Sequence, residues 1–245
     1  MVHINRAIPA DSLRLLVFDL DGTLIDSRQD LCNSVNATLE NFSLKPLPDS
    51  VIAGYIGDGA QMLIRRALSV PGEYPGHQLD GSDPAAEAFF QQAFAFFLDY
   101  YRAHKLDFTY VYPGVFDSLD ALRRQLPGCS MSVLTNKPFR PARAICEALG
   151  LSPYFSHVYG GDSFSTKKPD PAGLAALMHH AGARPEETLM VGDSDVDIRT
   201  ARNAGVWSIG CSFGLSPESL AVTAPDVLVD SAAEWVQAVG IAQLR

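Results

Sequence analysis

Two aspartates separated by one residue follow an apolar run near the start of the chain. The segment LLVFDLD, residues 15–21, contains this pair as Asp19 and Asp21. Side chains at positions i and i+2 of a strand point to the same face, so the spacing predicts that the two carboxylates crowd together. Because like charges repel, the pair also predicts a nearby cation or a shared proton.

Carboxylates in this arrangement can transfer a phosphoryl group. Asp19 could attack a phosphate monoester and form an aspartyl phosphate. Asp21 could then protonate the leaving alkoxide and later deprotonate the attacking water. Asp193 follows another apolar run and supplies a third carboxylate. Three acids that converge on a phosphate need a cation, and oxygen ligands favour Mg²⁺. Taken alone, capping of a helix N-terminus by Asp193 and Asp197 is the minor alternative.

The elements that must position these residues form an alternating pattern. The expected strands lie in LRLLVFDL (13–20), MSVLTN (131–136), HVYGGD (157–162), TLMVGDS (188–194), WSIGCS (207–212) and DVLVDS (226–231). Segments with helical spacing lie between them, at 115–126, 139–149, 170–181 and 196–204. Apolar strands that alternate with helices predict an α/β fold whose parallel sheet is covered on both faces. Ligands bind beyond the carboxyl ends of such strands, where Asp19, Thr135, Asp162 and Asp193 fall.

Residues 28–105 interrupt this alternation. They show helical spacing and no convincing strand, with expected helices at 30–42, 49–56, 59–68 and 85–104. The Gly/Pro-rich segment at 69–84 is expected to be a loop. The sequence therefore predicts an all-helical cap domain at 27–106, inserted into an α/β core formed by 1–26 and 107–245.

Composition restricts the partners of the protein. A chain of 245 residues is long enough for one core with an inserted subdomain. Its formal net charge of −9 disfavours a nucleic-acid partner. No segment predicts a signal peptide or a membrane helix, and the four cysteines form no C-x-x-C pair. We therefore expect a cytoplasmic protein with reduced thiols and no membrane partner, either a monomer or a small homo-oligomer.

Four short motifs occur in order along the chain. They are FDLDGT at 18–23, TNK at 135–137, KKPDP at 167–171 and GDSDVD at 192–197. Together they resemble the motifs of the haloacid-dehalogenase-like hydrolase superfamily. Longer sequence segments, including DLCNSVNATLE, YIGDGAQMLIRRAL and GGDSFSTKKPDP, are similar to those of the phosphoglycolate phosphatase family with a helical cap. The resemblance spans nearly the whole chain and implies a Rossmann-like parallel sheet with the inserted cap.

The resemblance also implies roles for individual residues. It implies that Mg²⁺ is held by the carboxylate of Asp19, the backbone carbonyl of Asp21 and the carboxylate of Asp193. Asp197 would lie behind these ligands and orient either Lys168 or a metal-bound water. Lys168 precedes Pro169 as in the superfamily's Lys-Pro pair, and would bridge the nucleophile and the phosphate.

The phosphate is expected to meet neutral donors as well. The hydroxyl of Thr135 and the amide of Asn136 would donate to its oxygens, which resembles an oxyanion hole. Two further charged residues of these motifs, Lys167 and Asp195, are expected to face solvent, as most surface lysines do.

The cap is expected to determine the substrate. Gly57, Asp58 and Gly59 open the helix that carries Arg65 and Arg66, and the resemblance places this segment opposite the active site. Helix N-termini attract anions, so the loop could contact a substrate carboxylate. A plain turn between two cap helices is the alternative.

The leading hypothesis is a Mg²⁺-dependent phosphatase that hydrolyses 2-phosphoglycolate to glycolate and phosphate through an aspartyl-phosphate intermediate. The alternatives are a sugar-phosphate phosphatase, such as one acting on N-acetylmuramic acid 6-phosphate, a pyrophosphatase or a phosphoglucomutase. A dehalogenase is disfavoured because those relatives lack the second aspartate of the motif, here Asp21. A catalytically inactive binding module is disfavoured by the intact Asp19, Asp21, Lys168 and Asp193.

Overall fold

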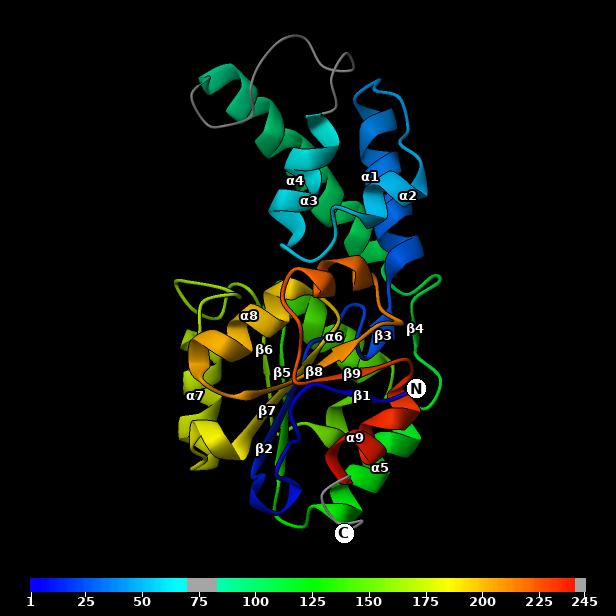
Figure 1. Cartoon of the computed structure of the whole chain (residues 1–245). Helices are drawn as coiled ribbons and strands as arrows, with labels where there is room; N and C mark the ends of the chain where they lie inside the picture. Colours follow the sequence, from blue (N-terminus) through cyan, green and yellow to red (C-terminus); the bar gives the residue numbers. More distant parts are fainter. Residues whose placement is uncertain (70–82, 241–245) are drawn as a thin grey trace. The chain divides into compact units, whose positions relative to one another are not determined.

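The computed structural model of the chain describes residues 1–69 and 83–240 (Figure 1). Residues 70–82, which make up most of the predicted loop at 69–84, lie outside the described residues. The chain divides into two compact units, one made of Met1–Asp26 with Tyr110–Arg245 and the other of Ser27–Thr109. The insertion expected from the sequence, 27–106, ends slightly before the second unit does.

A seven-stranded sheet forms the centre of the first unit, in the order β1-β9-β8-β7-β2-β5-β6. The strands are β1 (His3–Ile4), β2 (Leu15–Phe18), β5 (Ser130–Leu134), β6 (His157–Tyr159), β7 (Thr188–Gly192), β8 (Trp207–Cys211) and β9 (Val227–Val229). Neighbouring strands are parallel except β1 and β9, which are antiparallel. The predicted α/β fold with a parallel sheet is thus confirmed. The edge strand β1 was not predicted, because two residues show no alternation.

Helices cover both faces of this sheet (Figure 1). They are α5 (Val115–Gln125), α6 (Phe139–Ala148), α7 (Ala172–Ala181), α8 (Asp195–Ala204) and α9 (Trp235–Gly240). Short 3₁₀ helices lie at Ala10–Ser12, Ser152–Tyr154, Pro185–Glu187, Pro217–Ala221 and Ala232–Glu234. In β2, Leu16 and Phe18 pack in the core with α5, α6 and α9, whereas Leu15 and Val17 pack with α7 and α8. This central strand is apolar on both faces because both faces are covered.

A short antiparallel ribbon marks the two points where the chain leaves and re-enters the first unit. Its strands are β3 (Ile25–Asp26) and β4 (Tyr110–Val111), with Ile25 opposite Val111. The ribbon therefore fixes the start and the end of the insertion side by side. Neither strand was predicted, since each is only two residues long.

The described residues of the second unit form helices and no strand. The helices are α1 (Arg28–Asn41), α2 (Asp49–Ala53), α3 (Ala60–Leu68) and α4 (Pro84–His104). Their apolar faces enclose a separate core that includes Val35, Ile52, Ile64, Phe90 and Phe97. Three aromatic residues of α4, Phe90, Phe97 and Tyr101, are buried in this core. Within the part of the chain that the structure describes, no helix combines the length and apolarity that a membrane span requires.

A buried carboxylate ties the two ends of the second unit together. Asp30, in the first turn of α1, is 1% exposed. It accepts hydrogen bonds from the backbone N–H groups of Phe108 at 3.0 Å and Thr109 at 2.8 Å, and from the hydroxyl of Thr109 at 2.6 Å. A buried carboxylate is tolerated only with such donors, so Asp30 fixes the end of the insertion against its first helix.

Replacing Asp30 with alanine should lower the free energy of unfolding by about 2–3 kcal/mol, because three donors lose a charged acceptor. The matched control is Asp99→Ala in α4, whose carboxylate is 72% exposed and pairs with Arg102 at the surface. The control should change stability by less than about 0.5 kcal/mol. Urea unfolding followed by circular dichroism measures both values, and equal losses would contradict the role given to Asp30.

Candidate active site

Three neighbouring strands, β7, β2 and β5, end at one edge of the sheet, and each is followed directly by a polar residue. Asp19 follows β2, Thr135 follows β5 and Asp193 follows β7. The register places Phe18 opposite both Val133 and Val191, so the three strands end within one residue of the same level. Parallel pairing therefore brings together residues that are far apart in the sequence.

A buried lysine connects two of the carboxylates at this edge. The Nζ atom of Lys168 lies 2.7 Å from Oδ1 of Asp19 and 2.6 Å from Oδ1 of Asp197. Burial lowers the pKa of Lys168, but the charges of Asp19 and Asp197 outweigh burial and the net pKa is raised. Lys168 is thus held as a cation between the expected nucleophile and Asp197.

Asp197 also caps the helix that carries it. Its Oδ2 atom accepts hydrogen bonds from the backbone N–H of Ser194 at 3.1 Å and from the Ser194 hydroxyl at 2.7 Å. The same residues form a capping box at the start of α8. Asp197 thus caps the helix and also contacts Lys168, whereas its role in orienting Lys168 or a metal-bound water stays a prediction.

Asp193 lies in a slot formed by two loops. Its Oδ2 atom accepts hydrogen bonds from the backbone N–H groups of Leu215 at 2.7 Å and Ser216 at 3.2 Å. Gly22 has φ +88°, and a Cβ atom there would lie 2.2 Å from Asp193 Oδ2. A Cβ atom on Gly214 would lie 2.3 Å from the Cβ of Asp193. Both glycines are thus required for the close approach of the backbone to this carboxylate.

Among the described residues, Asp19, Asp193 and Asp197 form a group whose oxygens lie within 4.8 Å of one another. Burial raises the pKa of Asp193 well above its usual range, and the charges of Asp197 and Asp19 raise it further. Burial also raises the pKa of Asp19 to about 6, although Lys168 opposes this shift. One lysine does not balance three buried carboxylates. All the ligand atoms that this group offers are carboxylate oxygens, and such a set fits a hard divalent cation.

Asp21 faces a different cation. Its two carboxylate oxygens each lie 3.0 Å from the Nζ atom of Lys137, whose side chain is 5% exposed. The aspartate pair predicted a nearby cation or a shared proton, and the structure shows a separate lysine beside each carboxylate. Asp21 lies in the turn after β2 and bridges to Ile25, so strand alternation does not govern its direction. Lys137 was overlooked in the sequence, although it stands directly after the Thr-Asn pair.

Thr135 and Asn136 are both buried at the end of β5. The Oγ1 atom of Thr135 accepts a hydrogen bond from the backbone N–H of Lys137 at 3.2 Å. The Nδ2 atom of Asn136 donates to the backbone carbonyl of Lys168 at 3.1 Å, so this side chain fixes the segment that carries the lysine. That both residues donate to a phosphate remains a prediction.

One expected surface residue is less exposed than predicted. The side chain of Asp195 is 24% exposed, and its carboxylate lies 3.6 Å from Nη1 of Arg199 one helical turn later. Lys167 is exposed, as expected. His179 and His180 are also exposed, and His180 stacks on His157 with ring centroids 4.7 Å apart.

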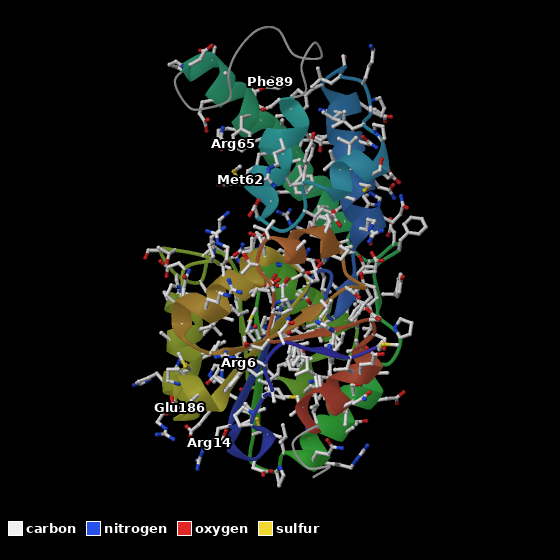
Figure 2. All side chains as sticks on the ribbon, viewed as in Figure 1. Arg6, Arg14, Met62, Arg65, Phe89 and Glu186 are labelled. Carbon is white, nitrogen blue, oxygen red and sulfur yellow. The ribbon has the colours of Figure 1, made fainter. Side chains whose placement is uncertain are left out.

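The predicted specificity loop, Gly57-Asp58-Gly59, belongs to the second unit. Its Asp58 pairs with Arg66, which also donates to the backbone carbonyl of Tyr55 at 3.1 Å. Arg65 (Figure 2) extends from α3 to Glu87 of α4 at 2.9 Å and lies 3.8 Å above the ring centre of Phe90. Both arginines thus make contacts inside their own unit. A substrate contact at this loop stays a prediction.

The chain is similar to known proteins over most of its length. The family model for haloacid dehalogenase-like hydrolase matches residues 16–211. The phosphoglycolate phosphatase of Pseudomonas putida is 37% identical over 232 residues, or 94% of this chain and 81% of that protein. The phosphoglycolate phosphatase of Rhodospirillum rubrum is 39% identical over 208 residues, or 85% of this chain and 83% of that protein.

A solved structure agrees with these relatives. It is the crystal structure of a predicted phosphoglycolate phosphatase from Haemophilus somnus, which matches with a TM-score of 0.80 and 31% sequence identity. The match covers 92% of this chain and 97% of that chain.

The charge imbalance predicts how a divalent cation changes stability with pH. The pKa of Asp19 is about 6 in the folded chain and about 3.9 in an unfolded one. Since the ionised form is the disfavoured one, metal-free protein should lose stability as the pH rises from about 4 to about 6. A divalent cation favours the ionised form, so 10 mM Mg²⁺ should raise Tm by about 3 °C or more at about pH 7 and by less at about pH 4.5.

Differential scanning fluorimetry with and without the cation provides this comparison. Asp193→Asn should remove most of the cation's effect at neutral pH, whereas the surface control Asp99→Asn should keep it. An equal Tm shift at both pH values, or an undiminished shift in Asp193→Asn, would contradict the assignment of the carboxylate group as a cation site.

Proposed function

Since this chain belongs to the haloacid dehalogenase-like hydrolase family, we propose that it is a Mg²⁺-dependent phosphatase that hydrolyses 2-phosphoglycolate to glycolate and phosphate. The observation that carries the proposal is the buried contact between Lys168 and the carboxylate of Asp19 at the end of the central strand. A carboxylate with a lysine at 2.7 Å is suited to attack an anionic phosphate, because the cation offsets the repulsion between nucleophile and substrate.

In the first half of the reaction, an oxygen of Asp19 attacks phosphorus in line with the ester bond. The ester P–O bond breaks, an aspartyl phosphate forms, and Asp21 donates a proton to the leaving alkoxide oxygen. In the second half, Asp21 takes a proton from the attacking water. The new P–O bond forms as the bond to Asp19 breaks, and phosphate leaves. Asp21 is thereby returned to its protonated state.

The surrounding residues hold these groups and the phosphate in place. Lys168 lies between Asp19 and Asp197, and its ammonium would contact a phosphate oxygen. Thr135 and Asn136 would supply neutral donors to the other oxygens. The donor set fits Mg²⁺ bound by Asp19, Asp193 and the backbone carbonyl of Asp21, where the ion would neutralise charge on the phosphoryl group.

We also propose that the protein acts in the reducing cytoplasm. All four cysteines are thiols rather than disulfides. Burial raises the pKa of Cys129 and Cys146 to about 12, so these thiols are poor nucleophiles and poor redox sensors. This is the state expected of cysteines that serve as small apolar residues.

The test of the proposed function is a kinetic comparison among phosphate esters in saturating Mg²⁺. We expect kcat/KM for 2-phosphoglycolate to exceed that for glucose 6-phosphate, N-acetylmuramic acid 6-phosphate and pyrophosphate by at least about tenfold, or ~1.4 kcal/mol of transition-state binding. A higher kcat/KM for a sugar phosphate would agree with the proposed reaction steps but would identify the protein as a sugar-phosphate phosphatase.

The control for this comparison is Asp19→Asn, since an amide cannot accept the phosphoryl group. The variant should lose turnover of every ester while keeping its unfolding midpoint within a few degrees of the wild type. Borohydride trapping during turnover should label Asp19 in the wild type. A label on another residue would overturn the nucleophile assignment, and absence of turnover of every ester in the wild type would overturn the phosphatase itself.

A further inference from the structure

The segment after β5 places one lysine beside the expected acid. Three contacts fix its backbone. The carbonyl of Lys137 accepts a hydrogen bond from the N–H of Gly161 at 2.9 Å, and its N–H donates to Thr135 Oγ1 at 3.2 Å. A Cβ atom on Gly160 would lie 2.2 Å from the backbone N of Phe139. The backbone at Gly160 therefore packs directly against the segment that carries Lys137. Lys137 is therefore held in one position.

The side chain of Lys137 is almost completely buried against Asp21. It is 5% exposed, and its ammonium lies 3.0 Å from both carboxylate oxygens of Asp21. Burying an ammonium is costly unless an anion pairs with it. The transfer of a proton to a leaving oxygen requires only Asp21. Lys137 is not needed for that step, and its burial at this position has a role if its ammonium also pairs with an anion of the bound substrate.

The proposed substrate carries such an anion at the required place. In 2-phosphoglycolate the carboxylate is separated from the ester oxygen by one methylene, so its nearer oxygen lies about 3 Å from the ester oxygen. Asp21 must lie within hydrogen-bond distance of that ester oxygen in order to protonate it. A cation 3.0 Å from the Asp21 oxygens is therefore within reach of the substrate carboxylate. An ammonium has three N–H donors, so one lysine can serve both carboxylates.

From this geometry we propose that Lys137 binds the carboxylate of the substrate and selects phosphate esters of 2-hydroxy acids over esters of neutral alcohols. The inference rests on the proposed function and adds the residue that recognises the leaving group. It assigns part of the substrate specificity to the first unit of the chain, at a lysine that contacts the proposed general acid Asp21.

The test compares two substrates that differ in the carboxylate alone. 2-Phosphoglycolate and ethyl phosphate both release a small alkoxide, and both need a proton from Asp21. We expect Lys137→Met to lower kcat/KM for 2-phosphoglycolate at least about tenfold more than it lowers kcat/KM for ethyl phosphate. Lys137→Arg should keep most of the wild-type ratio. Lys167→Met, a matched change at an exposed lysine of the same unit, should leave the ratio unchanged.

Two results separate this inference from the proposed function. If the wild type prefers 2-phosphoglycolate and Lys137→Met slows both substrates by the same factor, Lys137 only positions Asp21 and the inference fails alone. If the wild type hydrolyses ethyl phosphate as efficiently as 2-phosphoglycolate, the proposed function fails and the inference fails with it. Should Lys137→Met not fold, Lys137→Gln serves in its place, because its amide still donates to Asp21 without carrying charge.

Discussion

The buried ammonium of Lys168 is the interaction on which the candidate site depends. It lies between Asp19 and Asp197, and these two carboxylates approach a third on Asp193. Without the lysine, Asp19 and Asp197 would have no contacting cation among the described side chains, and burial would favour their neutral forms. A neutral Asp19 would not be a nucleophile. The charge of Lys168 thus both stabilises the buried carboxylates at this sheet edge and favours the ionised form of Asp19 that the reaction needs.

The rest of the first unit holds that ammonium and its partners in place. Parallel pairing of β2 and β7 sets Asp19 and Asp193 on adjacent strand ends, and the capping box of α8 fixes Asp197 behind them. Asn136, from the next strand, holds the backbone of Lys168. Each partner comes from a different element, so the site exists only once the sheet has formed. The single charge of Lys168 does not neutralise three carboxylates, so the charge balance favours binding of a further cation.

Sequence patterns identified the parts of the site that are local. Strands of four or five apolar residues stand out from their surroundings, and the polar residue after each was predicted to lie at the sheet edge. Asp19 and Asp193 were found in this way, and the resemblance added Lys168 and Asp197. Two-residue strands such as β1, β3 and β4 show no periodicity, which is why they were missed.

Contacts between distant segments were beyond the reach of those patterns. The pairing of Lys137 with Asp21 joins residues 116 positions apart. The N–H groups of Leu215 and Ser216 that hold Asp193 come from a loop with no motif. Asp195 was expected in solvent, but its backbone N–H donates to the hydroxyl of Ser219 at 3.0 Å, in a segment 24 positions away. Such contacts depend on how loops fold over the sheet edge rather than on residue type.

A double-mutant cycle between Lys168 and Asp197 tests the charge balance most directly. Lys168→Met alone should lower the free energy of unfolding by about 3–5 kcal/mol, because it leaves buried carboxylates without their cation. Adding Asp197→Asn removes one of those charges, so the double variant should be more stable than the sum of the single changes predicts, by at least about 1 kcal/mol. Urea unfolding of the metal-free proteins at neutral pH gives all four values. Single changes that add to within about 0.5 kcal/mol would show that the ammonium does not hold these carboxylates together.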